Sequence, residues 1–340
     1  MTRSFTLCIE GAGTATCISV LKGLSHQKRY EYRTVVLDMD NMVAGRFLAD
    51  GFHKTIGSKD DRYIDVVLDL CRSEGVNVYL PIIDYGFVKL SQARERFAAQ
   101  GVYLMIAPPE SIAVCADKVE TFNHFRKIGV PTPDTRAALK PGDKLDLPFP
   151  LILKPRWNGR ATLDVYKIQS NEELAFYTRG TENYLLQTFI DGQEFTADCL
   201  STPDGSRFVD CAVRLRLETK GGLAVKSALA EEADTVRVKA HIKTIAESLK
   251  LPGIYNIQGF LAKKRRTVFH RDQPALRRRA RPHHPHRAEQ HRAFACYAGW
   301  CFGRGSAKPY PFQSQNQNGA LLDGAVRRRR PCLGLGQFPS

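Results

Sequence analysis

The chain has 340 residues, of which 43% are hydrophobic and 25% charged, and it carries a net charge of +15. Because one ordinary domain has about 100 to 200 residues, we expect two or three domains. The longest apolar stretches are only strand-sized, so we expect no membrane association and a cytoplasmic location. Nine cysteines without a CxxC pair predict reduced thiols and argue against a disulfide framework or a zinc site.

Positive charge is concentrated toward the C-terminal end. Residues 270–340 contain 13 lysines and arginines but three acidic residues, which accounts for +10 of the +15. The same stretch has no isoleucine and a single valine, Val326. Core strands are rich in β-branched residues, and this stretch contains too few of them. We therefore predict that residues 270–340 form a disordered tail.

Strand and helix patterns alternate over residues 1–110. Apolar runs predict strands at 5–9, 34–37, 76–83 and 102–106, and helical spacing predicts helices at 18–24 and 64–73. This alternation predicts an α/β domain with a Rossmann-like, doubly wound parallel sheet. The turn from Gly11 to Thr14 has two glycines of a dinucleotide-binding GxGxxG motif, but Thr16 replaces the third. We therefore favour a close-packed strand-to-helix turn over a nicotinamide site.

The middle of the chain has a clear helix start. Asp117 and Glu120 have the form of a capping box, which predicts a helix that ends at Gly129 and places Lys118 at its N-terminus. Strands are then predicted at 150–154, at 165–168 and on both sides of Asp191-Gly192, within residues 184–198. A β-hairpin with Asp191-Gly192 as its turn is one arrangement of the last two strands.

A further strand pattern covers residues 213–217. Its alternation places Arg214 and Arg216 on one face, which suits the binding of anions; a solvated sheet face is the alternative. A helix is predicted at 236–249, followed by a strand at 254–260 that carries Gln258.

These segments together resemble an ATP-grasp ligase of the branch that includes biotin carboxylase and the synthetase halves of carbamoyl-phosphate synthase. The resemblance covers residues 5–269. It implies that the Rossmann-like domain, 1–110, is followed by an α+β ATP-grasp domain. That domain would comprise a small lid subdomain, 111–190, and an incomplete large subdomain, 191–269.

The resemblance also implies roles for individual residues. Lys118 and Lys154 would hold the ATP phosphates. A lysine ammonium is a point charge suited to phosphate, and a helix N-terminus adds to the attraction. The alternative is that both are solvated surface lysines. The other implied nucleotide-binding residues are Gly159 in the phosphate-covering loop, Gln187, Thr188, Phe189 and Ile190 in the adenine hinge, and Glu194 at the ribose. Arg214 and Arg216 would be catalytic, and Gln258 would bind the metal.

The implied activity is an ATP- and Mg²⁺-dependent ligation of a carboxylate to an amine or similar nucleophile through an acyl phosphate. Small-molecule carboxylates and amines would be its partners, with no membrane and no nucleic acid, and we allow for a homodimer. The alternative is a non-catalytic nucleotide-binding or nucleic-acid-binding protein with a basic tail.

The chain departs from the family after Phe269. The family continues with Ile-Glu-Ile-Asn-Pro-Arg, whose Glu and Asn bind Mg²⁺, whereas this chain continues with His270-Arg271-Asp272-Gln273. The codons CAT CGA GAT CAA CCC GCG CTT encode this chain from residue 270 and read as the family motif when the first base is removed. We therefore predict that residues 270–340 are an out-of-frame tail and that the printed chain has impaired activity.

Overall fold

The computed structural model describes residues 4–139, 143–157, 164–220, 223–262 and 266–273. Gly159 and the predicted tail from residue 274 onward lie outside these ranges. Residues 270–273, which we assigned to the tail, instead extend the last described strand. In the part of the chain that the structure describes, no helix is long and apolar enough to cross a membrane.

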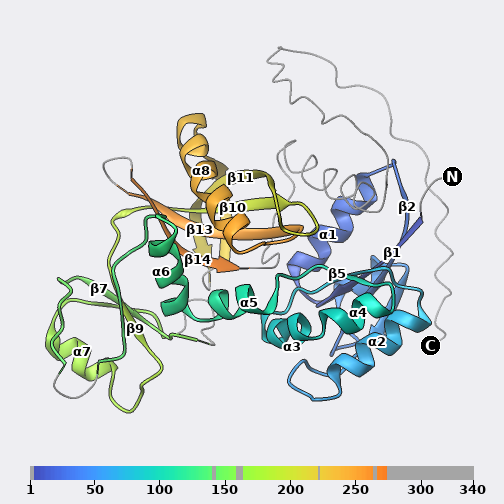
Figure 1. The fold of residues 1–340 in the computed structure, drawn as a ribbon, viewed down its shortest axis with the longest axis horizontal. Coiled ribbons are helices and arrows are strands. Elements are labelled where there is room, and N and C mark those ends of the chain that lie inside the picture. Colours follow the sequence, from blue (N-terminus) through green and yellow to red (C-terminus); the bar gives the residue numbers. More distant parts are fainter. Residues whose placement is uncertain (1–3, 140–142, 158–163, 221–222, 263–265, 274–340) are drawn as a thin grey trace, which may run out of the picture. The chain divides into compact units, whose positions relative to one another are not determined.

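The first domain (Figure 1) is built around the predicted parallel sheet. The strand order of this sheet is β3-β2-β1-β4-β5. Its elements are β1 (Ser4–Glu10), α1 (Ala15–His26), β2 (Glu31–Asp38), η1 (Ala44–Phe47), β3 (Gly51–Lys54), α2 (Tyr63–Ser73), β4 (Val78–Leu80), η2 (Asp84–Gly86), α3 (Phe87–Gln92), α4 (Arg94–Ala99) and β5 (Tyr103–Leu104). Alternate side chains of β1 enter different cores: Leu7 and Ile9 pack with α1, whereas Cys8 packs with α2, α3 and α4. The alternation of side chains along β1 thus gives the sheet an apolar core on each of its two faces.

The turn after β1 is close-packed, as predicted. A side chain on Gly45 would place its Cβ 2.5 Å from the carbonyl oxygen of Ala12. The amide of Gly13 donates to Oδ2 of Asp38 at 2.7 Å. In a dinucleotide site this amide would face a phosphate, and here it faces a carboxylate.

A four-stranded antiparallel sheet, the small sheet, follows two helices. The elements are α5 (Pro109–Ala116), α6 (Lys118–Lys127), β6 (Thr135–Ala137), β7 (Leu151–Lys154), β8 (Tyr166–Ile168), α7 (Asn171–Tyr177) and β9 (Leu185–Thr188). The strand order is β6-β9-β7-β8. Its core joins Leu151, Leu153 and Leu186 of the strands to Leu174 of α7.

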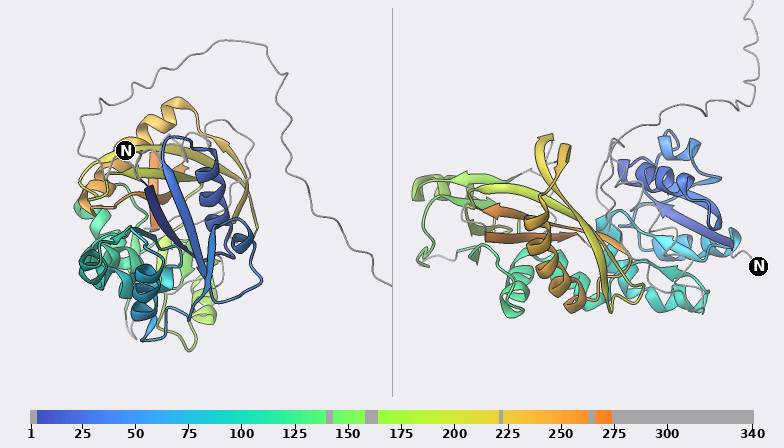
Figure 2. Two further views of the ribbon diagram at one scale, coloured as in Figure 1. Left: turned by 90° about the vertical axis from the view of Figure 1, so that its right-hand side faces the viewer. Right: turned by 90° about the horizontal axis from the view of Figure 1, so that it is seen from above.

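A five-stranded antiparallel sheet, the large sheet, completes the described chain. The elements are β10 (Gly192–Ser201), β11 (Phe208–Lys220), β12 (Leu223–Leu229), α8 (Glu232–Ser248), β13 (Ile254–Ala262) and β14 (Arg266–Gln273), in the order β12-β11-β10-β13-β14. Figure 2 shows α8 lying along this sheet. Val238 and Ile242 of α8 share a buried core with Phe195, Val213 and Ile257 of the strands. The other face carries polar side chains.

The hairpin interpretation of residues 184–198 was wrong, because β9 and β10 belong to different sheets. The amide of Phe189 bonds the carbonyl of Pro150 in the small sheet, whereas Gly192 opens β10 beside β13. A Cβ on Gly192 would lie 2.6 Å from the carbonyl oxygen of Leu261. The glycine is therefore required by a close approach of two strands and not by a hairpin turn.

Several element lengths also differ from the predictions. β4 and β5 cover only part of the predicted runs, and β11 is much longer, because strand ends depend on pairing partners and not on the apolar run alone. The helix predicted at 236–249 begins earlier, with Glu231 as its N-cap. The short strands β3 and β6 and the exposed strand β12 were missed because they lack a buried apolar run.

Candidate functional site

The N-terminus of α6 forms as the capping signal predicts. Oδ1 of Asp117 accepts hydrogen bonds from the amides of Val119 at 2.8 Å and Glu120 at 3.4 Å. The backbone of Asp117 is extended, so it stops α5 and starts α6 within one residue. Lys118 is thus the first residue of a helix, where amide groups give a partial positive charge.

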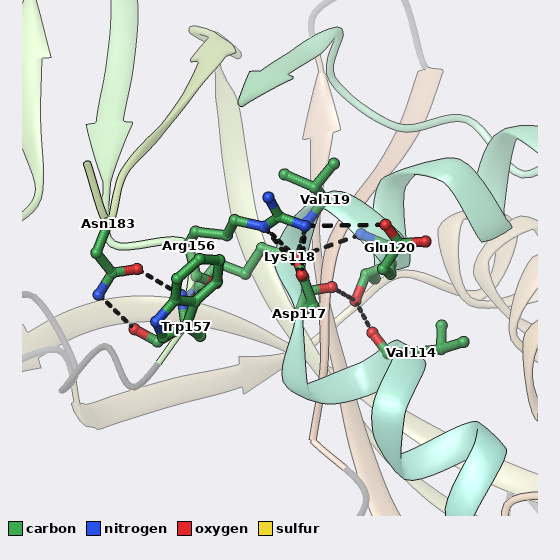
Figure 3. Close-up of polar contacts among 9 residues, drawn as sticks. Val114, Asp117, Lys118, Val119, Glu120, Arg156, Trp157 and Asn183 are labelled. Carbon is green, nitrogen blue, oxygen red and sulfur yellow. Dashed lines mark hydrogen bonds and ion pairs between the residues drawn. The ribbon is translucent and has the colours of Figure 1, made fainter. Parts of the chain in front are cut away.

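The carboxylate of Asp117 also binds Arg156, two residues beyond the end of β7 (Figure 3). Nε of Arg156 lies 2.9 Å from both carboxylate oxygens, and Nη2 lies 2.6 Å from Oδ2. Burial alone would raise the pKa of Asp117, but the hydrogen bonds and charge of Arg156, with those helix amides, lower it. The pair is therefore ionised at neutral pH, with both side chains largely covered.

Lys118 contacts the same segment. Its Nζ donates to the carbonyls of Pro155 at 2.7 Å and Arg156 at 3.1 Å, and its backbone amide donates to the carbonyl of Arg156 at 3.3 Å. Lys154, the last residue of β7, directly precedes these carbonyls and is partly buried. We call Asp117, Lys118, Lys154, Pro155 and Arg156 the α6–β7 junction. It brings the two predicted phosphate-binding lysines to one place in the fold.

Asn183 holds this segment from the other side (Figure 3). Its side-chain oxygen accepts from the amide of Trp157 at 3.2 Å, and its Nδ2 donates to the carbonyl of Trp157 at 3.2 Å. The guanidinium of Arg156 also lies over the Trp157 ring, 4.9 Å from its centroid. The chain just after β7 is therefore fixed through its backbone as well as through Arg156.

The predicted hinge lies at the end of β9. Gln187 points into the small sheet, where it is buried and its Nε2 donates to Oγ1 of Thr135 at 2.8 Å. The amide of Thr188 donates to the carbonyl of Asp134 at 3.0 Å. Phe189 is 37% exposed, and Nζ of Lys167 lies 3.9 Å from its ring centroid. Ile190 is partly buried in the short connection to β10.

The polar face of the large sheet gathers the other predicted residues. Because directly opposed residues of antiparallel strands share a face, the register defines this group. Its members, hereafter the polar sheet face, are Glu194, Thr196, Asp198, Arg214, Arg216, Asn256 and Gln258. Gln258 lies opposite Thr196, and Asn256 lies opposite Asp198.

Both arginines of the polar sheet face are ion-paired. Arg214 holds Asp198 with two bonds, Nε–Oδ2 at 2.6 Å and Nη2–Oδ1 at 2.9 Å, and Nη1 of Arg216 lies 3.1 Å from Oε1 of Glu194. Burial alone would lower the pKa of Arg214, but the charge and hydrogen bonds of Asp198 raise it. Burial lowers the pKa of Arg216, against the opposing charge of Glu194. The predicted ribose-binding carboxylate and one predicted catalytic cation thus contact each other.

The described residues do not fit a complete Mg²⁺ site. Gln258 and Asn256 offer amide oxygens, while the carboxylates of this face already bind arginines. The strand register places residues 271 and 273 directly opposite Gln258 and Asn256. Those positions hold Arg and Gln, and within the described ranges no three His, Cys, Asp or Glu residues could hold a metal ion together.

Sequence reasoning missed two residues of this arrangement. The sequence gives no local signal for the role of Arg156, because its partner Asp117 lies 39 positions away. Asp198 follows Glu194 and Thr196 at two-residue spacing, so strand alternation could have placed it on the same face.

Comparison with known proteins agrees with this architecture. Residues 8–105 match the family described as "PylC-like, N-terminal domain", and residues 115–255 match the family described as "ATP-grasp domain". A carbamoyl-phosphate synthase from Methanobrevibacter smithii is 22% identical over 220 residues, which are 61% of this chain and 59% of that protein. This chain therefore spans less than two thirds of that curated relative.

Two solved structures share the fold. One is the N5-carboxyaminoimidazole synthetase of Staphylococcus aureus complexed with ADP, with TM-score 0.65 and 14% identity over 82% of this chain and 72% of that one. The other is the biotin carboxylase domain of Hydrogenobacter thermophilus 2-oxoglutarate carboxylase in complex with MgADP, ADP and bicarbonate. Its TM-score is 0.64, with 14% identity over 81% of this chain and 65% of that one. The chain therefore contains a PylC-like N-terminal domain followed by an ATP-grasp domain.

Proposed function

We propose that this protein is an ATP-dependent ligase that activates a carboxylate and transfers it to an amine or a similar nucleophile. The α6–β7 junction carries the proposal, because it joins a lysine at a helix N-terminus to the strand end that bears a second lysine. This is a favourable environment for phosphates. Two proteins of the same fold were solved in complex with ADP, which supports a nucleotide as the ligand.

Each group has a proposed role that follows from its chemistry. Lys118 and Lys154 would hold phosphate oxygens as point charges, and Gly159, which lies outside the described residues, would belong to the phosphate-covering loop. Residues 187–190 would contact the adenine through their backbone, with Phe189 offering an exposed ring. Glu194 would contact the ribose. Its carboxylate would then have to bind the ribose and Arg216 together, or release its ion pair with Arg216.

The proposed reaction has two balanced steps. A carboxylate oxygen of the substrate attacks the γ-phosphorus of ATP, the bond to the bridging oxygen breaks, and ADP leaves, giving an acyl phosphate. The amine nitrogen then attacks the acyl carbon, and the C–O bond breaks with its electron pair going to phosphate. The proton lost by the amine goes to solvent or phosphate. Arg216, and Arg214 if Asp198 releases it, would hold the anionic groups in place.

We further propose that the printed chain binds nucleotide but turns it over poorly. Positions 271 and 273, opposite Gln258 and Asn256, are those that become Glu and Asn when one base is removed before codon 270. The register thus agrees with the frame hypothesis, because restoration would add a carboxylate and an amide oxygen beside two existing amide oxygens. Position 271 is an arginine in this sequence, a residue type that offers a cation no oxygen ligand.

A single-turnover assay of ADP formation tests both parts. We would compare the printed chain, the double variant Arg271→Glu/Gln273→Asn, and the product of the gene with one base removed, each with candidate carboxylates with and without amines. We expect all three proteins to bind ATP. We expect only the double variant and the frame-corrected product to form ADP. ADP formation by the printed chain at the restored rate would refute the impairment, and failure of all three to bind ATP would refute the ligase proposal. Sequencing the gene across codons 267–279 decides the frame independently.

A further inference from the structure

We propose that Arg156 is a positioning residue that acts through Lys118, a role that rests on the proposed nucleotide-binding function. In this role the Asp117–Arg156 ion pair clamps the N-terminus of α6 against the end of β7. The clamp would hold Lys118 and Lys154 together as one phosphate-binding unit. Arg156 itself would not contact the nucleotide, because its guanidinium is engaged with Asp117 and stacked on Trp157.

The geometry links the ion pair to the lysine directly. Nζ and the backbone amide of Lys118 both bond to the carbonyl of Arg156, so this residue contacts α6 with its side chain and its main chain. Asp117 in turn caps the helix that Lys118 begins. A shift of the Arg156 side chain from Asp117 would therefore move the carbonyls that orient the Lys118 ammonium.

Low exposure distinguishes this pair from an ordinary surface ion pair. Both side chains are largely covered, with 27% exposure for Arg156 and 21% for Asp117. By contrast, the ion pair between Arg136 of β6 and Asp146, which precedes β7, is 41% and 56% exposed. Arg136 also grips its carboxylate with two nitrogens but contacts neither lysine, which makes this pair a matched control.

Substitutions can separate the clamp from the helix cap. Asp117→Asn keeps a good N-cap while removing the charge that holds Arg156. Arg156→Gln removes the guanidinium but leaves both carbonyl acceptors of Lys118 in the chain. Asp146→Asn breaks the control pair. Thermal unfolding followed by circular dichroism verifies that all three variants fold.

Two measurements on the full-length protein then test the proposal. Calorimetric titration with ADP measures the dissociation constant. The rate of Lys118 acylation without nucleotide, measured by peptide mass spectrometry, shows how strongly its contacts hold the amine. Exposed Lys127 at the other end of α6 serves as the internal reference. For Asp117→Asn and Arg156→Gln we expect the ADP dissociation constant to rise about tenfold, the loss of roughly one charge-assisted contact. We also expect Lys118 to acylate several-fold faster, with neither change in Asp146→Asn.

The outcomes separate the positioning role from the ligase proposal. If the wild type binds ADP and both clamp variants match it in affinity and in Lys118 acylation, the positioning role is refuted. An equal loss of affinity in Asp146→Asn also refutes it, because the effect would then be general to the sheet. If the wild type does not bind ADP, the nucleotide proposal fails, and Lys118 acylation alone decides whether Arg156 positions the lysine.

Discussion

Removing Asp198 should strongly destabilise the large sheet. The substitution Asp198→Ala deletes the carboxylate that accepts two hydrogen bonds from Arg214, whose side chain is 10% exposed. The guanidinium cannot shed its proton, so it stays as a buried charge that has lost its main carboxylate. Such losses cost about 3–5 kcal/mol, which corresponds to a melting temperature lower by roughly 6–20 °C for a protein with domains of 150–250 residues.

Urea unfolding of the wild type, Asp198→Ala and the double variant Asp198→Leu/Arg214→Met measures this cost. We expect the double variant to recover most of the lost free energy, because the charge is removed together with its partner. The control Asp146→Ala, which breaks an exposed and solvent-screened pair, should cost far less free energy of unfolding than Asp198→Ala. A cost for Asp198→Ala as small as that of the control would refute our description of Arg214 as a buried cation held by Asp198.

Three further predictions follow from single residues. Burial raises the pKa of Glu10, although the hydrogen bond from Tyr63 acts in the opposite direction. The raised pKa of this carboxyl group contributes stability that is fully present below the unfolded-state pKa of about 4.3. This stability is lost as the pH rises through the folded-state pKa. Urea unfolding at pH 5 and pH 8 should therefore show Glu10→Gln gaining stability relative to wild type at the higher pH; a constant difference would contradict this. Burial lowers the pKa of His241, so wild type should lose stability relative to His241→Gln as the pH falls below about 6.5, and parallel pH profiles of melting temperature would contradict this. Gly192→Ala should cost about 1–3 kcal/mol in urea unfolding because its Cβ would meet a backbone carbonyl, and a neutral result would show that β10 and β13 can separate.

Features set by neighbouring residues were the ones that could be predicted from the sequence. The parallel sheet followed from apolar periodicity, and the start of α6 followed from Asp117, whose cap bonds reach only two and three residues ahead. The Asp191-Gly192 signal misled because a turn and a close strand approach both need glycine, and only the pairing of β10 with β13 distinguishes them.

The positions of the two lysines in the fold could be predicted from the sequence, with Lys118 at the start of a helix and Lys154 in a strand, but their contacts could not. Lys118 and Lys154 came from motifs, whereas the ion pair between Asp117 and Arg156 joins residues far apart in sequence. Similarly, strand alternation placed Arg214 and Arg216 on one face but could not show that carboxylates of β10 already neutralise them. Such pairings depend on strand order and register, which no local pattern specifies.

Equilibrium binding of ATP to the printed chain and to its Lys118→Met and Lys154→Met variants tests the central claim most directly. Our account predicts that the wild type binds ATP, that each substitution weakens binding at least tenfold, and that the matched Lys127→Met variant binds like the wild type. Unchanged affinity in both Lys118→Met and Lys154→Met would contradict the assignment of the α6–β7 junction as the phosphate-binding site.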